Sequence, residues 1–287
     1  MASKADRKVG YALGGGGARG LSHIGVLKVL EEHGYQPEAI AGTSIGALVG
    51  VLYAGGLRAA EIEEVALGLK WRRMARLVDP IVSLSGFVQG KRITSLLKSI
   101  LGDLSFPDLK VKFAAVATDI VSGEEMILSS GSVLDAVRAS FSIPGILTPV
   151  RVGGRYLVDG GLVNEVPVNV CRQMGAEYVV GVNVIPDPAA MLQRPGPERR
   201  WVRGKKTAAA GSKRRKPETP GRGRPNVVQV LSQSLLIPGY RVAKQDLAGA
   251  DLAISPAVGG IGFFDFDRAA EAIAAGEEAA REALRRR

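Results

Sequence analysis

The chain is poor in cysteine and histidine, and each scarcity excludes a class of protein. Cys171 is the only cysteine among 287 residues, so no intrachain disulfide can form, and a cytoplasmic location is the default expectation. Together with this thiol, His23 and His33 are too few to build a zinc site from histidine and cysteine. No apolar run reaches the roughly 18 residues of a transmembrane helix, and the opening MASKADRKVG lacks a signal-peptide core.

Aromatic side chains are also scarce, at 5% of the sequence, whereas hydrophobic residues make up 46%. A chain of this length can bury a full core as one large domain or at most two small ones. Short apolar runs that predict strands alternate with amphipathic runs that predict helices. We therefore expect a three-layer α/β/α fold with a mainly parallel central sheet, covered on both faces.

The elements are predicted from hydrophobic periodicity, glycine and proline. Strands are expected at 9–14, 39–42, 112–119, 124–128, 155–158, 178–184 and 251–254. Helices are expected at 18–33, 45–54, 59–69, 93–101, 133–141, 167–174, 227–243 and 267–286. We expect one catalytic domain formed by residues 8–185 and 226–260, a disordered basic insert at 186–225, and a C-terminal helix at 265–287.

The excess positive charge belongs to one segment. Residues 194–224 contain twelve Lys or Arg and two Glu, which accounts for the whole formal net charge of +10. Such a segment is typical of a solvated disordered loop, and it would also attract anionic lipid headgroups or nucleic acid. Trp201 is its only aromatic residue, so base stacking is poorly supported and nucleic acid is the least favoured partner.

The sequence GTSIG follows the second predicted strand and leads into a predicted helix. A G-x-S-x-G pattern at such a junction is typical of a nucleophilic serine, held on a turn too tight for side chains on its neighbours. Ser44 is therefore the candidate nucleophile, with Gly42 and Gly46 beside it. The alternative is a glycine-flanked turn in which Ser44 caps the helix.

A nucleophilic serine needs a base. In the α/β-hydrolase order a histidine follows the serine, but none follows His33, so that scheme is excluded. Asp159, before Gly160 and Gly161, is the best remaining candidate, because a carboxylate in a partly dry pocket can gain enough proton affinity. The alternative is an aspartate in a plain turn. We expect His33 to end a helix. His23, near the glycine loop, is expected to have a structural role, and the alternative is that it touches the site.

The run GGGGARG precedes a predicted helix. Backbone N–H groups at a helix N-terminus can stabilise the oxyanion of acyl transfer, and Gly15, Gly16 and Gly17 are the candidates. Arg19 is expected to brace the loop, to form a structural salt bridge or to face an anionic headgroup. A dinucleotide site, also suggested by the glycine spacing up to Gly20, lacks the acidic residue that it needs at the end of the second strand.

Taken together, these motifs resemble those of the patatin-like phospholipase family. So do VATD at 116–119, ASFSIPGILTP at 139–149 and YLVDGGLVNEVPV at 156–168. The resemblance covers roughly residues 8–185, resumes weakly at 227–260, and does not supply the basic insert. The motif residues around the site are Arg19, Gly20, Gly42, Gly46, Gly160 and Gly161.

The resemblance implies a serine hydrolase that cleaves acyl esters of lipids, of the phospholipase or lysophospholipase A type. It implies a Ser44–Asp159 dyad, an oxyanion hole at the glycine loop, and no metal or cofactor. A thioesterase or a small-ester carboxylesterase would use the same residues. A non-catalytic protein that binds membranes or nucleic acid through the basic insert is a further alternative. Residues 70–77, with the apolar run 81–88, are the candidate lid at a membrane surface.

Overall fold

The computed structural model describes residues 7–69, 94–95, 98–100, 102, 104–188 and 227–286. The candidate lid and residues 189–225 of the basic insert lie outside these residues, as do four of the nine residues of the helix expected at 93–101, whose five described residues are helical. The strands are β1 (Val9–Leu13), β2 (Pro37–Thr43), β3 (Lys112–Asp119), β4 (Glu125–Leu128), β5 (Val150–Val152), β6 (Arg155–Asp159), β7 (Tyr178–Val182) and β8 (Leu252–Ile254). The helices are α1 (Ser22–Glu32), α2 (Ile45–Ala54), α3 (Ala59–Gly68), α6 (Val133–Ser140), α7 (Val168–Gln173), α9 (Val227–Leu247) and α10 (Ala269–Arg285).

The strands form one eight-stranded sheet in the order β5-β6-β3-β2-β1-β7-β8, with β4 also paired to β3. Neighbours from β3 to β8 along this order are parallel, whereas β4, β5 and β6 join antiparallel. The expected mainly parallel sheet is therefore confirmed. The strand β5 was not expected, and it forms a hairpin with β6.

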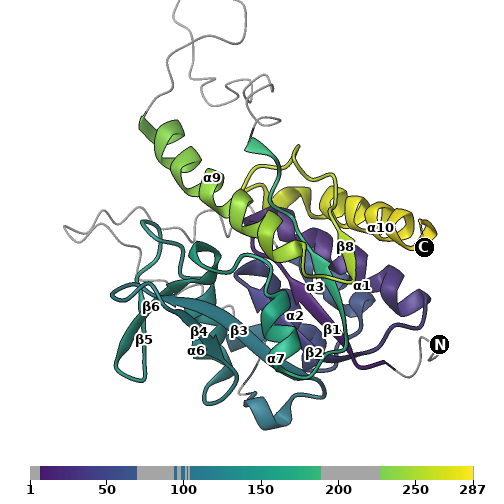
Figure 1. Cartoon of the computed structure of the whole chain (residues 1–287), viewed down its shortest axis with the longest axis horizontal. Coiled ribbons are helices and arrows are strands. Elements are labelled where there is room, and N and C mark those ends of the chain that lie inside the picture. The colour runs from purple at the N-terminus through teal and green to yellow at the C-terminus, as the bar shows by residue number, and fades with distance from the viewer. Residues whose placement is uncertain are drawn as a thin grey trace, which may run out of the picture.

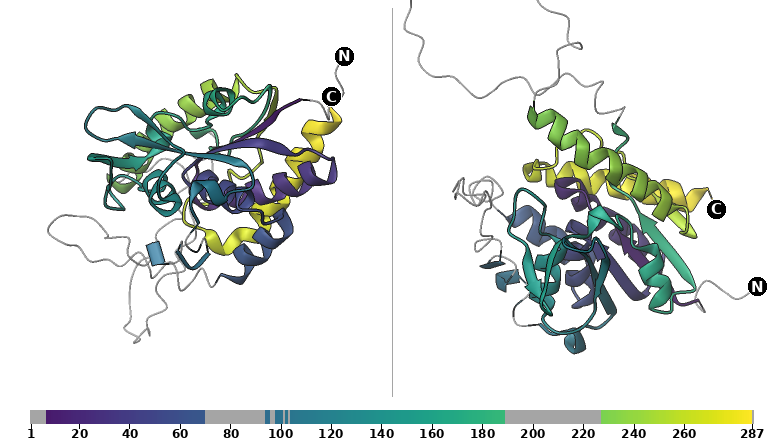
Figure 2. Two further views of the ribbon diagram at one scale, coloured as in Figure 1. Left: turned by 90° about the horizontal axis from the view of Figure 1, so that it is seen from below. Right: turned by 60° about the vertical axis from the view of Figure 1, so that its left-hand side comes forward.

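Helices cover both faces of the sheet (Figures 1 and 2). The larger core cluster joins one face to α1, α2, α3, α6 and α10. The smaller cluster joins the other face to α7 and α9 through residues such as Ala41, Val116, Val170 and Ala243. This arrangement is the expected three-layer α/β/α architecture.

Two short helical turns lie beside the site. The helix expected to begin at residue 18 begins instead with a 3-10 turn, η2 (Gly17–Leu21), and α1 follows from Ser22, whose hydroxyl donates to Arg19 O at 2.7 Å. A second 3-10 turn, η4 (Gly160–Leu162), continues from β6. The helix α9 runs to Leu247, four residues beyond its expected end.

The strand register explains why distant motifs meet. Leu13 pairs with Gly42, so the segments that follow β1 and β2 leave the sheet at the same edge. Thr43 pairs with Val116 on one side of β3, and Asp159 pairs with Ala117 on its other side. The residue after Thr43 and the last residue of β6 therefore flank β3 at nearly the same height.

Candidate active site

Ser44 lies at the turn between β2 and α2, in a strained backbone conformation. Its φ is 54° and its ψ is −120°, and no other non-glycine residue in the described ranges has a positive φ. It stands at the N-cap of α2, but its side chain makes no capping hydrogen bond. The alternative of a helix-capping serine therefore loses its support, and the strain is typical of a functional position.

The two glycines of GTSIG are required by close backbone approaches. A β-carbon at Gly42 would lie 2.5 Å from Ala47 Cα, and one at Gly46 would overlap Leu13 O and lie 2.6 Å from Gly14 O. These neighbours are backbone atoms, so they cannot move aside as a side chain would. The pattern thus has the physical basis that the sequence suggested.

Asp159 meets Ser44 at the end of β6. The Ser44 side chain lies close enough to the Asp159 carboxylate to favour its charged form, and Gly161 N–H donates to Asp159 Oδ1 at 2.9 Å. Burial raises the pKa of Asp159 to about 6, against the opposing effect of these two groups. The structure thus brings the two sequence-predicted residues together, with a carboxylate whose proton affinity suits a base near neutral pH.

The segment that contains ASFSIPG holds both residues by their backbones. Ser44 N–H donates to Ser140 Oγ at 2.9 Å, and Asp159 N–H donates to Ser142 O at 2.9 Å. The buried Arg138 donates to Ser142 Oγ at 2.5 Å. Sequence reasoning used this segment only as part of the resemblance and missed its positioning role.

The glycine loop offers two unpaired N–H groups. Gly14 and Gly15 donate to Val182 O at 3.0 Å and to Glu165 O at 3.2 Å. Gly16 and Gly17, at φ 147° and 61°, donate to no acceptor in the part of the chain that the structure describes. Of the three predicted oxyanion donors, Gly15 is therefore already engaged.

His23 is buried beneath this loop. Its Nε2 lies 2.7 Å from Gly14 O, and because a carbonyl oxygen only accepts, Nε2 carries the proton. Burial lowers the pKa of His23 to about 4, so the ring is neutral at pH 7. The expected structural role fits this geometry. His33 follows α1, as expected, with Nδ1 2.8 Å from Val29 O.

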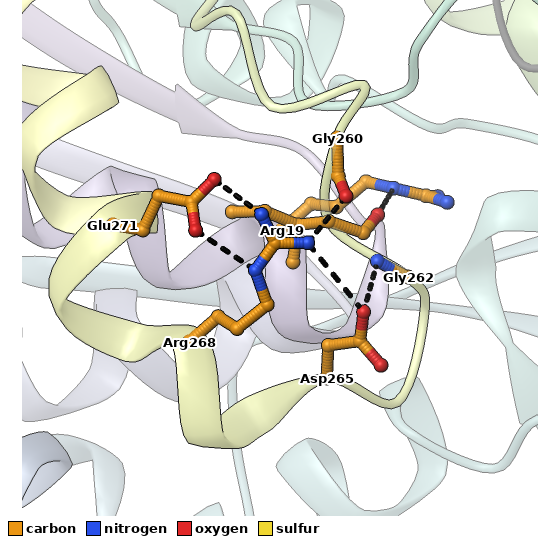
Figure 3. Close-up of polar contacts among 7 residues, drawn as sticks. Arg19, Gly260, Gly262, Asp265, Arg268 and Glu271 are labelled. Carbon is orange, nitrogen blue, oxygen red and sulfur yellow. Dashed lines mark hydrogen bonds and ion pairs between the residues drawn. The ribbon is translucent and has the colours of Figure 1, made fainter. Parts of the chain in front are cut away.

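Arg19 braces the glycine loop against the segment that follows β8. The side chain is buried, and its Nε donates to Ile261 O at 2.8 Å, while Ala18 N–H donates to Phe263 O at 2.9 Å. Figure 3 shows Arg268 contacting Glu271, Gly260 and Asp265 of the same region. This geometry fits the first of the three expected roles, a brace for the loop.

Glu165 is a site residue that sequence reasoning missed. Its buried carboxyl lies against both Gly15 and Gly161, where a β-carbon on either glycine would overlap it. Burial, followed by the negative charges of Asp159 and Asp246, raises its pKa well above the usual value. The available signal was an acidic residue inside the otherwise uncharged run GLVNEVPV, since buried acidic residues are rare.

Two features are absent from the described residues. None of their helices has both the length and the apolar character for a membrane crossing. In the same ranges, no three or more His, Cys, Asp and Glu side chains form a group that could hold a metal ion.

Known proteins resemble this chain in sequence and in fold. An uncharacterized NTE family protein of Mycobacterium tuberculosis is 38% identical over 177 residues, which are 62% of this chain and 49% of that protein. Lysophospholipase NTE1 of Debaryomyces hansenii is 35% identical over 185 residues, which are 62% of this chain and 12% of that protein. VipD from Legionella pneumophila shares the fold, with a TM-score of 0.59 at 14% identity over 99% of this chain and 69% of its own.

The chain spans about half the length of the mycobacterial relatives that it matches. The family model for patatin-like phospholipases matches residues 11–172, from within β1 to within α7. That match takes in the glycine loop, the serine turn and the aspartate turn. The chain belongs to the patatin-like phospholipase family.

Proposed function

We propose that this protein hydrolyses acyl esters of lipids, as a phospholipase or lysophospholipase of the A type. Its family membership and the lysophospholipase among its relatives support the substrate class. The observation that carries the proposal is the meeting of Ser44, on its strained turn, with the buried Asp159 carboxylate, whose charged form the Ser44 side chain favours. We assign Ser44 as the nucleophile and Asp159 as the general base.

The first half-reaction forms an acyl-enzyme. Asp159 accepts the hydroxyl proton while Ser44 Oγ attacks the ester carbonyl carbon. The tetrahedral intermediate then collapses, the ester C–O bond breaks, and the leaving alcohol takes the proton from Asp159. With a pKa of about 6, Asp159 is mostly ionised at pH 7 and is still basic enough to accept the proton.

The second half-reaction releases the fatty acid. Asp159 accepts a proton from a water molecule, whose oxygen attacks the acyl carbon, and the bond to Ser44 Oγ breaks as the proton returns to the serine. The same carboxylate therefore serves both halves.

We assign the oxyanion hole to Gly16 and Gly17. Their positive φ angles are readily reached only by glycine, and their N–H groups are unpaired within the described ranges. Preorganised N–H donors of this kind stabilise the negative charge that develops on the carbonyl oxygen. Gly15 is the weaker candidate, because its N–H already faces Glu165.

A fluorophosphonate probe tests the proposal directly. Wild-type protein should be labelled and should release p-nitrophenol from acyl esters. Ser44→Ala should lose both activities, and Asp159→Asn should lose turnover. The control Ser129→Ala alters an exposed serine and should behave as wild type. Failure to label folded wild type, with liposomes present, would contradict the proposal. A preference for long acyl chains would favour a lipase, and faster cleavage of short esters or thioesters would favour the alternatives.

We also infer peripheral contact with anionic membranes through the basic insert. Residues 194–224 carry the whole formal net charge of +10, and basic segments are attracted to anionic lipid surfaces. Pulldown with anionic liposomes should be weaker for a deletion of residues 194–224, and the difference should vanish at high salt. Equal binding at low salt would contradict this inference.

A further inference from the structure

Glu165 lies between the two halves of the site. A β-carbon at Gly15 would overlap Glu165 Oε1 and would lie 3.4 Å from Ser44 Cβ. A β-carbon at Gly161 would overlap Glu165 Oε2 and would lie 3.3 Å from Asp159 Oδ1. One buried carboxyl therefore fills the space between the glycine loop and the aspartate turn, close to both proposed reacting groups.

The surroundings of Glu165 are acidic. Asp159 faces it from the end of β6 and Asp246 from α9, and both raise its proton affinity. Asp246 Oδ2 accepts the backbone N–H groups of Glu165 and Val166 at 2.9 and 3.1 Å, and the pKa of Asp246 is itself raised by burial and by Glu125. Neither Asp159 nor Glu165 is paired with a Lys or Arg within the described residues.

The donors in this cluster are divided unequally. Asp159 accepts from Gly161 N–H, and its charged form is also favoured by the Ser44 side chain. The charged form of Glu165 is favoured only by the nearby Gly15 N–H, which donates to the Glu165 backbone carbonyl. Two neighbouring buried carboxylates without a cation cannot both be ionised at low energetic cost. The group with fewer donors is the one that retains a proton, and here that group is Glu165.

We propose that Glu165 is a positioning residue that works as a neutral acid, joining the oxyanion loop to the Asp159 turn. Oε1 lies against Gly15, whose N–H donates to the backbone carbonyl of Glu165, and the proton resides on Oε2, which faces Gly161 and Asp159. This arrangement fixes the loop while adding no negative charge near Ser44. An ionised Glu165 would oppose the oxyanion that forms when Ser44 attacks. The catalytic consequence of this inference rests on the proposed hydrolase function. The retained proton on Glu165 does not.

The retained proton is testable without turnover. A carboxyl whose pKa is raised on folding stabilises the folded state at low pH, and that stabilisation is lost as pH rises toward the raised pKa. As pH rises, the unfolding equilibrium constant of wild type should therefore increase relative to that of Glu165→Gln. The ratio of the two constants should grow by up to about tenfold per pH unit, or up to about 100-fold from pH 6 to pH 8. Urea unfolding at both pH values measures this ratio, with the exposed Glu177→Gln as the matched control.

Infrared spectroscopy supplies a second measurement. At pH 8 the wild type should show the carbonyl band of a protonated carboxylic acid, and Glu165→Gln should lack it. If Glu165→Gln does not fold, the band must persist in Asp246→Asn, which leaves Glu165 in place. A pH-independent stability ratio, or no such band in wild type, would overturn the proposal even for an active hydrolase.

The catalytic consequence is tested by the pH dependence of kcat. Glu165→Gln, which resembles the neutral acid, should retain at least ten times the kcat of Glu165→Ala, which should fall about 100-fold because the loop loses its support. Wild type should lose activity at high pH as Glu165 ionises, and Glu165→Gln should not. An alkaline loss that persists in Glu165→Gln, or equal kcat values for the two variants, would contradict the positioning role. Absence of fluorophosphonate labelling in wild type would instead count against the hydrolase function.

Discussion

Replacing Ser44 by glycine should give an inactive protein that is more stable than the corresponding alanine variant. Both substitutions remove the hydroxyl and its interaction with the Asp159 carboxylate, so that loss cancels in the comparison. What remains is the backbone, which has φ 54° and ψ −120°. These angles lie far from the left-handed helical minimum near φ 57°, ψ 47°, and they are readily reached only by glycine.

The expected difference follows from three contributions. We place the strain relieved by glycine near the upper end of the usual range, at about 3 kcal/mol. Glycine loses about 1 kcal/mol through the greater freedom of the unfolded chain, and burial of the alanine methyl group contributes about 0.8 kcal/mol. The balance favours Ser44→Gly by about 1 kcal/mol, which corresponds to a rise in Tm of about 2–4 °C.

Urea unfolding followed by circular dichroism measures the difference, with thermal unfolding as a second assay. Gly68 provides the matched control, because it lies in α3 without a positive φ and a β-carbon there would meet open space. At that position the preference should reverse, so Gly68→Ala should stabilise by about 0.5–1 kcal/mol. If Ser44→Ala proves as stable as Ser44→Gly while the control behaves as expected, the argument from strain at the serine turn is wrong.

Three further predictions concern the same site. As pH drops below about 6, kcat should fall by roughly tenfold per pH unit, because Asp159 must be ionised to accept a proton. A kcat that stayed constant from about pH 4.5 to 8 would contradict this prediction. Gly46→Ala should destabilise by at least about 2 kcal/mol, since its β-carbon would overlap Leu13 O, and an unchanged urea midpoint would refute the clash. Arg19→Met should lower kcat by tenfold or more while the protein remains folded, because the glycine loop loses the hydrogen bond that braces it against the segment after β8. A kcat equal to that of wild type would show that this brace is dispensable.

Much of the fold could be predicted because its elements carry strong local signals. The strand at 112–119 and the helix at 45–54 have the predicted bounds, since one is a short buried apolar run and the other follows a glycine-flanked turn. The strand β5 was missed, although Gly153 and Gly154 both adopt positive φ angles in the turn between β5 and β6. Two consecutive glycines are a hairpin signal, but three residues with one charge show too little alternation to predict a strand.

The end of α9 depended on contacts between distant parts of the chain. Pro238 lies inside this helix, and the sequence pattern weakens before its true end at Leu247. The last turn places Asp246 where its carboxylate accepts the N–H groups of Glu165 and Val166. A local pattern cannot report such a contact, so the shorter predicted helix left Asp246 out of the site.

Contacts between distant parts of the chain also explain why only some residues of the candidate site could be predicted. Ser44 and Asp159 stand on turns whose glycines are visible in the sequence, and the strand register then brings them together. Glu165 has no such turn, and its carboxyl is buried against both Gly15 and Gly161. The sequence predicts Gly15 as an oxyanion donor and Gly161 as a neighbour of Asp159, yet the space beside each of them is occupied by the carboxyl group of Glu165. In this site, a glycine therefore marks a position with no room for a β-carbon of its own. Only the folded structure shows which group occupies the space beside it.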